Sequence, residues 1–435
     1  MPAAPQPHAG HEFGHQTGDA AHHHPDIMSP PNDVTVIDFA ADSAKLRQFP
    51  YTDMQKFLEE KTNAGGMCQW ICMNAVNHDA ILALAKAKEL HPLAVEDVLS
   101  RVNRTKVEWY SDDLYAVLPL HKLITRDHGA TSGGSSQIPH SKDAAITEGA
   151  GRNSIVTLQR RRNPRSENRV KYMEDISPLS RRQLGVSVEQ VSIFMLDNNT
   201  VVSIFERSAA DVLRPLAARL FEKNTILRRS ADASLLFQAI IDAIVDMAIP
   251  ITLAYQESIA ELEYQVLSNP HIEQPRQLYA LSSEINQLQL GMRPLAQVVG
   301  SLCAHPTMSP GLDSESATIS PLAQMYFRDV EDHIVLIVTS FDGMIASTGN
   351  LTTLIYNQLG TSQNDSINRL TLFTIFFLPL TFLTSYFGMN FEEMWTIQHS
   401  EFFFWGLTLP IMLVTTFFLN RWLKRTTTLR VRTKH

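Results

Sequence analysis

Two long runs of uncharged residues near the C-terminus constrain this 435-residue chain more than any other feature. Leu370 to Met389 contains 20 residues without a charge, and Phe402 to Leu419 contains 18. As a helix, each run is long enough to cross a hydrocarbon core of about 30 Å. Core helices of soluble proteins seldom run so far without a charged residue, so we expect two transmembrane helices at 370–389 and 402–419.

The charges that flank these runs predict how the chain lies in the membrane. The tail, 420–435, carries six Lys and Arg residues and no acid, whereas the connection, 390–401, carries three Glu residues and no base. Basic flanks stay on the cytoplasmic side, and two spans return the chain to the side where it started. Both termini are therefore expected in the cytoplasm, with a short acidic loop outside.

The amino-acid composition limits the kinds of binding partner and the cellular compartment expected for this protein. The chain has 45 Asp and Glu against 37 Lys and Arg, which argues against a nucleic-acid binder that relies on bulk positive charge. Three cysteines cannot form a disulfide framework and indicate a reducing compartment. The first 30 residues contain neither an apolar stretch nor an Arg, so no targeting peptide is expected. The plasma membrane is then the favoured location, with a vacuolar membrane as the alternative.

Before the membrane spans, the pattern of apolar residues predicts a mixed α/β domain over 33–230. A helix is expected at Asp79–Lys88. Strands are expected at Val34–Phe39, Gln69–Met73, Leu114–Leu120, Val188–Met195 and Thr200–Glu206. We predict a disordered His-rich tail over 1–32 and a disordered insertion over 124–187, which is rich in Gly and Ser and then in Arg. The expected fold class is an α+β cytoplasmic domain, a mixed α/β/α sandwich, followed by stalk helices and two transmembrane helices.

The stalk region is predicted over 231–369, where helical periodicity dominates. Helices are expected at Ala231–Leu267 and Pro275–Cys303, and a third from Pro321 into the first span. At 1.5 Å per residue, the third helix would reach about 100 Å, which suits a stalk that carries the cytoplasmic domain to the membrane.

One stripe of the first span is polar. Thr374, Thr381, Ser385 and Gly388 fall on the same side of a helix with 100° per residue, and Leu378 lies in the same stripe. Threonine and serine in membrane helices commonly satisfy backbone carbonyls near a proline, here Pro379, so the stripe alone does not establish a pore.

The end of that span carries a motif. Gly388-Met389-Asn390 follows an aromatic pair and precedes the acidic loop, and in this setting the sequence resembles the CorA family of magnesium transporters. The segments Tyr326–His333, His91–Leu99 and Phe377–Phe382 also look like segments of that family. The resemblance covers roughly 33–425 without the insertion.

The resemblance implies a homopentamer whose first span lines a pore for hydrated Mg²⁺. Mg²⁺ gives up its water reluctantly, so a pore is expected to bind the hydrated ion. Neutral oxygens bind it strongly enough for the ion to enter the pore and weakly enough for it to leave. The implied pore and selectivity residues are Asn364, Thr381, Gly388, Met389 and Asn390, and the implied hydrophobic gate is Ile367, Leu370 and Leu378. The acids of the outer mouth, Glu392 and Glu393, would concentrate cations there.

The family also places regulatory Mg²⁺ between cytoplasmic domains, and the matching acids here are Asp97 and Asp329. Carboxylates that face each other repel unless a cation bridges them, so bound Mg²⁺ would hold a closed state. On the residues alone, the favoured interpretation is that Asp97 is a surface acid near a helix end and Asp329 a solvated stalk residue, and only the resemblance raises the sensor role beside it.

We therefore expect a passive Mg²⁺ transporter that is closed by cytoplasmic Mg²⁺. It is not expected to be an enzyme or to bind an organic cofactor or nucleic acid, and no ATP-binding P-loop occurs in the sequence. The alternatives are transport of Zn²⁺, Co²⁺ or Ni²⁺ on the same scaffold, and a membrane-tethered scaffold protein that works through the Arg-rich insertion.

Overall fold

The computed structural model describes residues 33–60, 67–100, 104–110, 113–126, 156–304, 318–389 and 401–432. The chain divides into two compact units. The first unit comprises Met1–Ile259 with Tyr279–Ala346, and the second comprises Ala260–Leu278 with Ser347–His435.

A seven-stranded sheet forms the centre of the first unit, in the order β2-β1-β3-β7-β6-β5-β4. Neighbouring strands are antiparallel except β3 and β7, which are parallel. The strands are β1 (Val34–Phe39), β2 (Ala44–Phe49), β3 (Cys68–Asn74), β4 (Lys106–Trp109), β5 (Asp113–Thr125), β6 (Leu184–Leu196) and β7 (Thr200–Phe205). All five predicted strands are present, and β2 and β4, at the two edges, were not anticipated.

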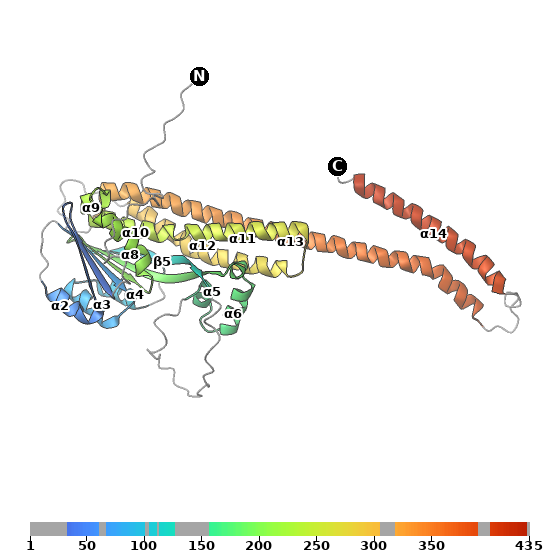
Figure 1. The fold of residues 1–435 in the computed structure, drawn as a ribbon, viewed down its shortest axis with the longest axis horizontal. Coiled ribbons are helices and arrows are strands. Elements are labelled where there is room, and N and C mark those ends of the chain that lie inside the picture. Colours follow the sequence, from blue (N-terminus) through green and yellow to red (C-terminus); the bar gives the residue numbers. More distant parts are fainter. Residues whose placement is uncertain are drawn as a thin grey trace, which may run out of the picture. The chain divides into compact units, whose positions relative to one another are not determined.

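Helices cover both faces of the sheet (Figure 1). One face packs against α2 (Met54–Glu59), α3 (His78–Ala87) and α4 (Pro92–Leu99), whose apolar residues share a core with β1, β3, β5, β6 and β7. On the other face lie α8 (Ala209–Phe221), which contacts β3, and α10 (Ala233–Asp246), which contacts β5, β6 and β7. The short helix α9 (Ile226–Ser230) joins them. The expected α/β/α sandwich is confirmed.

The disordered insertion predicted over 124–187 is wrong where the structure describes it. β5 continues to Thr125, β6 begins at Leu184, and three short helices lie between them. These are α5 (Leu158–Arg162), α6 (Glu167–Ile176) and α7 (Pro178–Arg181). Arginines of this segment pair with acids elsewhere in the chain: Arg161 of α5 pairs with Glu206 at 3.3 Å, and Arg182, which follows α7, pairs with Glu257. Residues 127–155 and the predicted tail, 1–32, lie outside the described part of the chain.

Four long helices follow: α11 (Ile249–Ser268), α12 (Gln274–Ala304), α13 (Pro321–Phe387) and α14 (Glu401–Arg432). The helix predicted at Ala231–Leu267 is divided between α10 and α11. The boundary predicted at residue 230 does not separate two units, because α10 buries its apolar face on the sheet. α13 is one continuous helix of 67 residues, as its sequence predicts.

Candidate functional site

Two segments of the second unit have the length and composition of membrane spans. The most apolar window of α13 is only 6% buried, and so is that of Phe402–Leu419 in α14. Ala233–Ser268 is equally apolar, but 67% of its best window is buried, so its apolar residues belong to the protein core. The predicted gate residues lie on the exposed part of α13, where the side chains of Ile367, Leu370 and Leu378 are 53–68% exposed.

The threonines of the first span bond to their own helix. The hydroxyl of Thr374 donates to the carbonyl of Leu370 at 3.0 Å, and that of Thr381 donates to the carbonyl of Phe377 at 2.9 Å. The sequence-based interpretation that these hydroxyls satisfy backbone carbonyls therefore agrees with the geometry. It leaves the lone pairs of each hydroxyl oxygen available to other donors, because a hydroxyl is both a donor and an acceptor.

The helix ends at the predicted glycine. The amide of Gly388 donates to the carbonyls of Thr384 at 3.0 Å and Ser385 at 3.2 Å, which closes the last turn. A Cβ on residue 388 would stand 3.0 Å from the carbonyl oxygen of Thr384, so a larger residue would strain this turn. Met389 follows and is 40% exposed. The predicted residues Asn390, Glu392 and Glu393 lie outside the described part of the chain.

The first and second spans meet at this end. The rings of Phe387 and Phe404 stand 5.3 Å apart at 89°, an edge-to-face arrangement. Tyr386 packs edge-to-face on Phe387 at 5.7 Å. The aromatic pair that precedes the glycine thus packs α13 against the start of α14.

The first predicted regulatory acid, Asp97, lies on α4 and has a cation of this chain beside it. Lys106 Nζ, on β4, stands 2.6 Å from Asp97 Oδ2 and 2.8 Å from Glu108 Oε1. Burial disfavours the charge of Lys106, but the hydrogen bonds to Asp97 and Glu108 outweigh it, and the pKa of Lys106 is raised. The hydrogen bonds from Lys106 and Tyr110 lower the pKa of Glu108.

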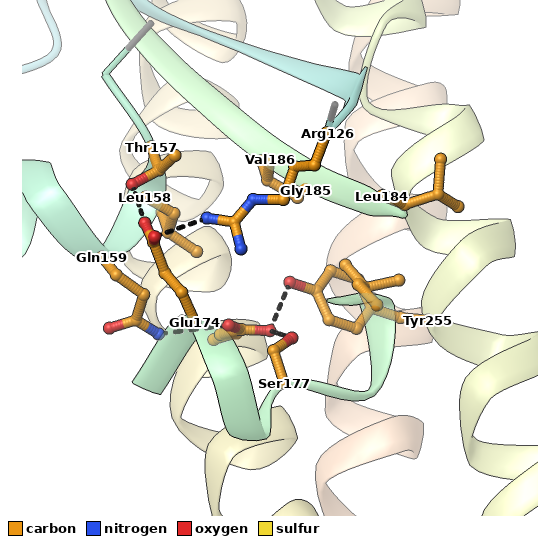
Figure 2. Close-up of a pocket in the computed structure, with 12 residues that line it drawn as sticks. Arg126, Thr157, Leu158, Gln159, Glu174, Ser177, Leu184, Gly185, Val186 and Tyr255 are labelled. Atoms are coloured by element: carbon orange, nitrogen blue, oxygen red, sulfur yellow. Dashed lines mark hydrogen bonds and ion pairs between the residues drawn. The ribbon is translucent and has the colours of Figure 1, made fainter. Parts of the chain in front are cut away.

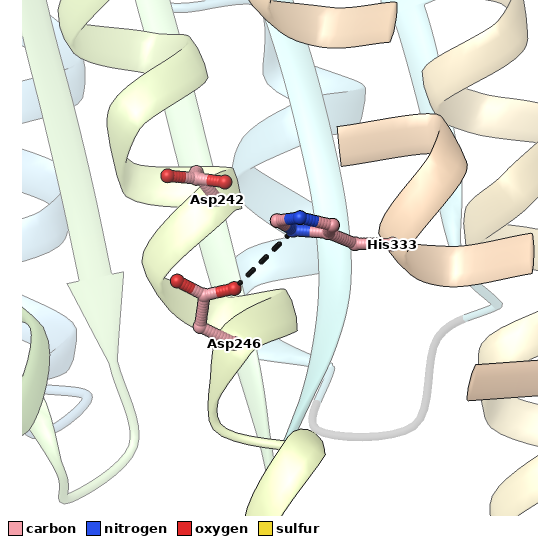
Figure 3. Close-up of side chains that lie close together, drawn as sticks. All are labelled: Asp242, Asp246 and His333. Atoms are coloured by element: carbon pink, nitrogen blue, oxygen red, sulfur yellow. Dashed lines mark ion pairs between the residues drawn. The ribbon is translucent and has the colours of Figure 1, made fainter. Parts of the chain in front are cut away.

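The second predicted regulatory acid, Asp329, is exposed on α13 and lies near three residues that the sequence pattern did not single out. Asp242 and Asp246 of α10 and His333 of α13 place one ligand atom each within 4.8 Å of one another (Figure 3). His333 Nδ1 stands 3.5 Å from Asp246 Oδ1, and neither atom has a hydrogen-bond partner among the described residues. We call these three residues the acid–histidine cluster.

The two carboxylates of the acid–histidine cluster lie close together and repel each other, an effect that the positive charges of Arg219 and His333 oppose. Burial, and then the charge of Asp246, raise the pKa of Asp242 to about 6. Burial also raises the pKa of Asp246, although the nearby His333 opposes the shift. Asp329 adds a further like charge to both carboxylates. Two carboxylates and an imidazole whose ligand atoms lie this close together suit a divalent cation, so the donor set fits such an ion.

A separate polar cavity lies where α5 and α7 meet the long helices (Figure 2). It encloses about 20 Å³, room for roughly one water molecule. Among the lining residues, the buried carboxylate of Glu284 on α12 accepts hydrogen bonds from Ser177 at 2.9 Å, Tyr255 at 3.0 Å and Gln159 at 3.2 Å. Burial raises the pKa of Glu284 despite these donors.

The rim of this cavity joins the two sides of the insertion. Arg126, at the end of β5, pairs with Glu174 of α6 at 2.7 Å, and Thr157 donates to the same carboxylate. A cavity for one water, surrounded by groups that already bond each other, is too small for an organic ligand. The residues around the cavity therefore dock α5–α7 onto α11 and α12.

Comparisons with known proteins agree on one family. Residues 176–425 match the family described as CorA-like Mg²⁺ transporter protein. The cobalt/magnesium transport protein CorA of Thermotoga maritima is 24% identical over 351 residues, which cover 80% of each chain. A Schizosaccharomyces pombe protein described as a metal ion transporter is 22% identical over 387 residues, 86% of this chain and 52% of that protein.

Solved structures show the same fold. The complete CorA magnesium transporter of Methanocaldococcus jannaschii matches with a TM-score of 0.61 at 14% identity, covering 90% of this chain and 97% of that one. The full-length CmaX protein matches with a TM-score of 0.56 at 11% identity, covering 91% and 99%. At these identities the structural likeness concerns the fold alone.

Proposed function

The chain belongs to the CorA-like Mg²⁺ transporter family, and from that premise we propose that it carries hydrated Mg²⁺ passively into the cytoplasm. The observation that supports this most is the C-terminal part of α13. Large apolar side chains are exposed along it, its threonine oxygens keep free lone pairs, and it ends in the Gly388 turn. A helix of this kind suits the lining of a pore.

One chain cannot enclose that pore, because two spans leave no closed lumen. We propose that several copies, five by the family resemblance, surround one axis with α13 innermost. Asn364 and Thr381 would then face the ion along the axis, and Asn390 would form the outer ring beyond Gly388 and Met389. The apolar Ile367, Leu370 and Leu378 would form a constriction that closes by excluding water.

The chemistry of the proposed lining suits a hydrated divalent ion. Mg²⁺ prefers six oxygen ligands and releases water slowly, so a ring of neutral amide and hydroxyl oxygens can hold the ion through its waters without trapping it. Glu392 and Glu393 would raise the local cation concentration at the mouth, an effect that salt weakens. A membrane potential that is negative inside adds about 4.6 kcal/mol per 100 mV for a divalent ion.

We propose that cytoplasmic Mg²⁺ closes the transporter through acids of the first unit. Asp97 and Asp329 remain the proposed sensors, and the acid–histidine cluster beside Asp329 supplies further ligand atoms of fitting chemistry. A bound ion would relieve the repulsion between Asp242 and Asp246 and link them to His333, and so would favour the state in which α10 and this part of α13 are close. Loss of the ion would release that constraint.

Cobalt is the second candidate cargo, because the Thermotoga relative is named for both cobalt and magnesium. Purified protein in liposomes with an internal Mg²⁺-sensitive dye tests the proposal. We expect inward flux with external Mg²⁺, driven further by a negative internal potential. Co²⁺, Ni²⁺ and Zn²⁺ should compete weakly if Mg²⁺ is the cargo. If the flux of Co²⁺ exceeds that of Mg²⁺, Co²⁺ becomes the proposed cargo. If none of these ions crosses the membrane, the transport proposal is refuted.

The same assay tests the scaffold alternative, in which the Arg-rich insertion carries the function. A variant without residues 127–155 should still transport Mg²⁺ under our proposal. Arg126, which precedes the deleted segment, and Thr157, which follows it, both bond Glu174. The deletion therefore leaves these flanking residues held to the same carboxylate. Loss of all flux in a folded, assembled variant would support the alternative instead.

A further inference from the structure

The first residues of α10 and α13 meet at one carboxylate. Asp232, which precedes α10, accepts a hydrogen bond of 2.9 Å from the amide of Ser234 and one of 2.6 Å from the hydroxyl of Ser320, which precedes α13. The hydroxyl oxygens of the two serines are 3.0 Å apart, and that of Ser320 also accepts from the amide of Ala323 at 3.2 Å. A negative charge is stabilised at a helix N-terminus, and this carboxylate serves two. We call Asp232, Ser234 and Ser320 the capping triad.

The sheet holds the capping triad in place. Asn199, in the turn between β6 and β7, donates to the carbonyl of Ala231 at 2.8 Å and accepts from the amide of Ala233 at 2.8 Å. These two bonds hold the backbone on both sides of Asp232. The start of α10 is therefore fixed to the sheet, and the capping triad fixes the start of α13 to the same point.

From the capping triad, α10 and α13 run parallel to the acid–histidine cluster. Phe237 of α10 meets Phe327 of α13, with ring centroids 6.3 Å apart, and further along Asp246 meets His333. Apolar packing has no direction of its own, and packed helices can shift by one turn. Hydrogen bonds instead need a donor and an acceptor about 3 Å apart. The bonds of the capping triad therefore set the position of α13 along α10.

The acid–histidine cluster tolerates little change in that position. Its three ligand atoms lie within 4.8 Å of one another, and they come from both helices. A shift of α13 by one helical turn is about 5.4 Å. Such a shift would carry His333 away from Asp242 and Asp246, which stay together on α10. A cation held by all three residues therefore requires one alignment of the two helices.

We propose that the capping triad is a positioning device for cation binding by the acid–histidine cluster. Asp232 holds the first turn of α13 against that of α10, and so keeps His333 opposite the two carboxylates. This role rests on the part of the proposed function in which the cluster binds Mg²⁺. No residue of the capping triad belongs to the cluster, so a change at the triad lowers cation affinity without removing a ligand.

Mn²⁺ binding by the full-length protein in detergent tests this role without reference to transport. Carboxylate ligands suit Mn²⁺ as they suit Mg²⁺, and bound Mn²⁺ no longer contributes to the electron paramagnetic resonance signal of the free ion. The binding that Asp242→Asn removes is the binding of the cluster. Ser320→Ala deletes the bonds of this hydroxyl without changing charge or ligands. We expect it to weaken binding at the cluster about tenfold, as the loss of supporting contacts commonly does.

A second helix cap supplies the matched control. Asn77 accepts a hydrogen bond of 3.0 Å from the amide of Ala80 at the start of α3, on the other face of the sheet. Asn77→Ala removes this cap and lowers stability in the same way. It should leave Mn²⁺ binding unchanged, because α3 contributes nothing to the cluster.

A disulfide separates alignment from stability. With Ser234→Cys and Ser320→Cys together, two sulfurs replace oxygens that are 3.0 Å apart, and small side-chain rotations bring them to bonding distance. The reduced double variant lacks the hydroxyl bonds and should bind Mn²⁺ weakly. The oxidised one holds the two helix starts together and should bind like wild type, with the disulfide verified by mass spectrometry.

Three results would overturn the proposal: wild-type affinity in Ser320→Ala, an equal loss in Asn77→Ala, or weak binding by the oxidised double-cysteine variant. If wild type and Asp242→Asn bind Mn²⁺ alike, the cluster is no cation site and the positioning role falls with it. Transport would still stand or fall on the liposome flux. The expected binding results in a protein without Mg²⁺ flux would support the positioning role and refute only transport.

Discussion

The imidazole of His121 on β5 lies directly against the backbone of Gly291 on α12. A Cβ placed on Gly291 would stand 2.8 Å from Cε1 of that ring and 3.0 Å from Nε2. His121 is almost completely buried, and burial, with Arg161 nearby, lowers its pKa to about 4. A neutral imidazole therefore fills the space that a glycine leaves, and this contact joins a long helix to the sheet.

We predict that Gly291→Ala lowers the thermal unfolding temperature of the purified protein. The added methyl would force the buried ring or the helix to shift, and overpacking of this kind costs about 1–3 kcal/mol. Gly343→Ala on α13 is the matched control, because a Cβ there meets nothing within 4 Å. That control should be neutral or slightly stabilising, since Ala favours helix by about 1 kcal/mol over Gly. Equal effects of the two changes would contradict the predicted close packing.

Glu284 provides a second test, through pH. Burial raises its pKa in the folded protein above the ordinary value, so its titration contributes stability at low pH that is lost as pH rises through the raised pKa. Glu284→Gln does not titrate, and its unfolding temperature should therefore improve relative to wild type as the pH rises above the ordinary glutamate pKa of about 4.3 and through the raised pKa of Glu284. A difference that stays constant over this range would show that the carboxyl titrates normally.

The hydrogen bonds that Glu284 accepts predict a second, larger effect on the unfolding temperature. Glu284→Leu would leave three buried donors, on Ser177, Tyr255 and Gln159, without their acceptor. Each such donor costs about 1–3 kcal/mol, so we expect a much lower unfolding temperature than for Glu284→Gln. Limited proteolysis should then cut within α5–α7 first, because Glu284 docks these helices. Comparable stability of the two variants would contradict this docking role.

The acid–histidine cluster predicts stabilisation by Mg²⁺ that depends on pH. Because the pKa of Asp242 is raised to about 6, the carboxylate is charged and able to bind a cation above that pH and is protonated below it. Saturating Mg²⁺ should raise the unfolding temperature more at pH 7.5 than at pH 5. An ion at 100 times its Kd stabilises by about 2.7 kcal/mol.

Two variants that each remove one negative charge identify the residues through which Mg²⁺ stabilises the protein. Asp242→Asn should raise the unfolding temperature without Mg²⁺ at pH 7.5, because it removes a buried charge, and should reduce the gain from Mg²⁺. Asp332→Asn, an exposed acid on α13 next to His333, changes the net charge equally and should keep the full gain. If both variants lose the Mg²⁺-dependent rise in unfolding temperature to the same extent, Mg²⁺ acts by general screening of the negative charges of the protein.

Asn390→Ala is predicted to reduce Mg²⁺ flux into liposomes at least tenfold while the protein still assembles. The side-chain amide would supply the neutral oxygen ring that holds the hydrated ion at the pore entrance. Asn350→Ala changes an exposed asparagine of α13 far from the span and should leave flux unchanged. Gel filtration checks assembly of both variants. Normal flux through a pore that lacks Asn390 would refute the proposed selectivity role.

The parts of the fold that the sequence predicted well have strong local patterns. β1 is a run of six buried residues, and its predicted bounds match those of the structure. Between the two strands predicted at Val188–Met195 and Thr200–Glu206, Asn199 has the positive φ of 58° that a tight hairpin turn requires. The edge strands β2 and β4 were missed because they are mostly half-exposed and contain Lys, Arg and Glu.

The errors concern structure that depends on distant partners. α5 and α7 are only five and four residues long, too short to show helical periodicity, and their arginines suggested disorder. Their order comes from partners such as Glu284, more than 100 residues later. The acid–histidine cluster was missed for the same reason, although Asp242 and Asp246 stand four residues apart on a mostly apolar helix, which was a usable signal.

The threonines of the first span have a further consequence. Thr371, Thr374, Thr381 and Thr384 each donate the hydroxyl proton to the carbonyl four residues earlier. A molecule that meets these oxygens finds lone pairs and no proton to accept. The water shell of a cation points its hydrogens outward and can bond such a surface, whereas an anion finds no donor. If α13 lines the pore as we propose, the helix backbone would thus give the span a preference for the sign of the ion, without any charged side chain.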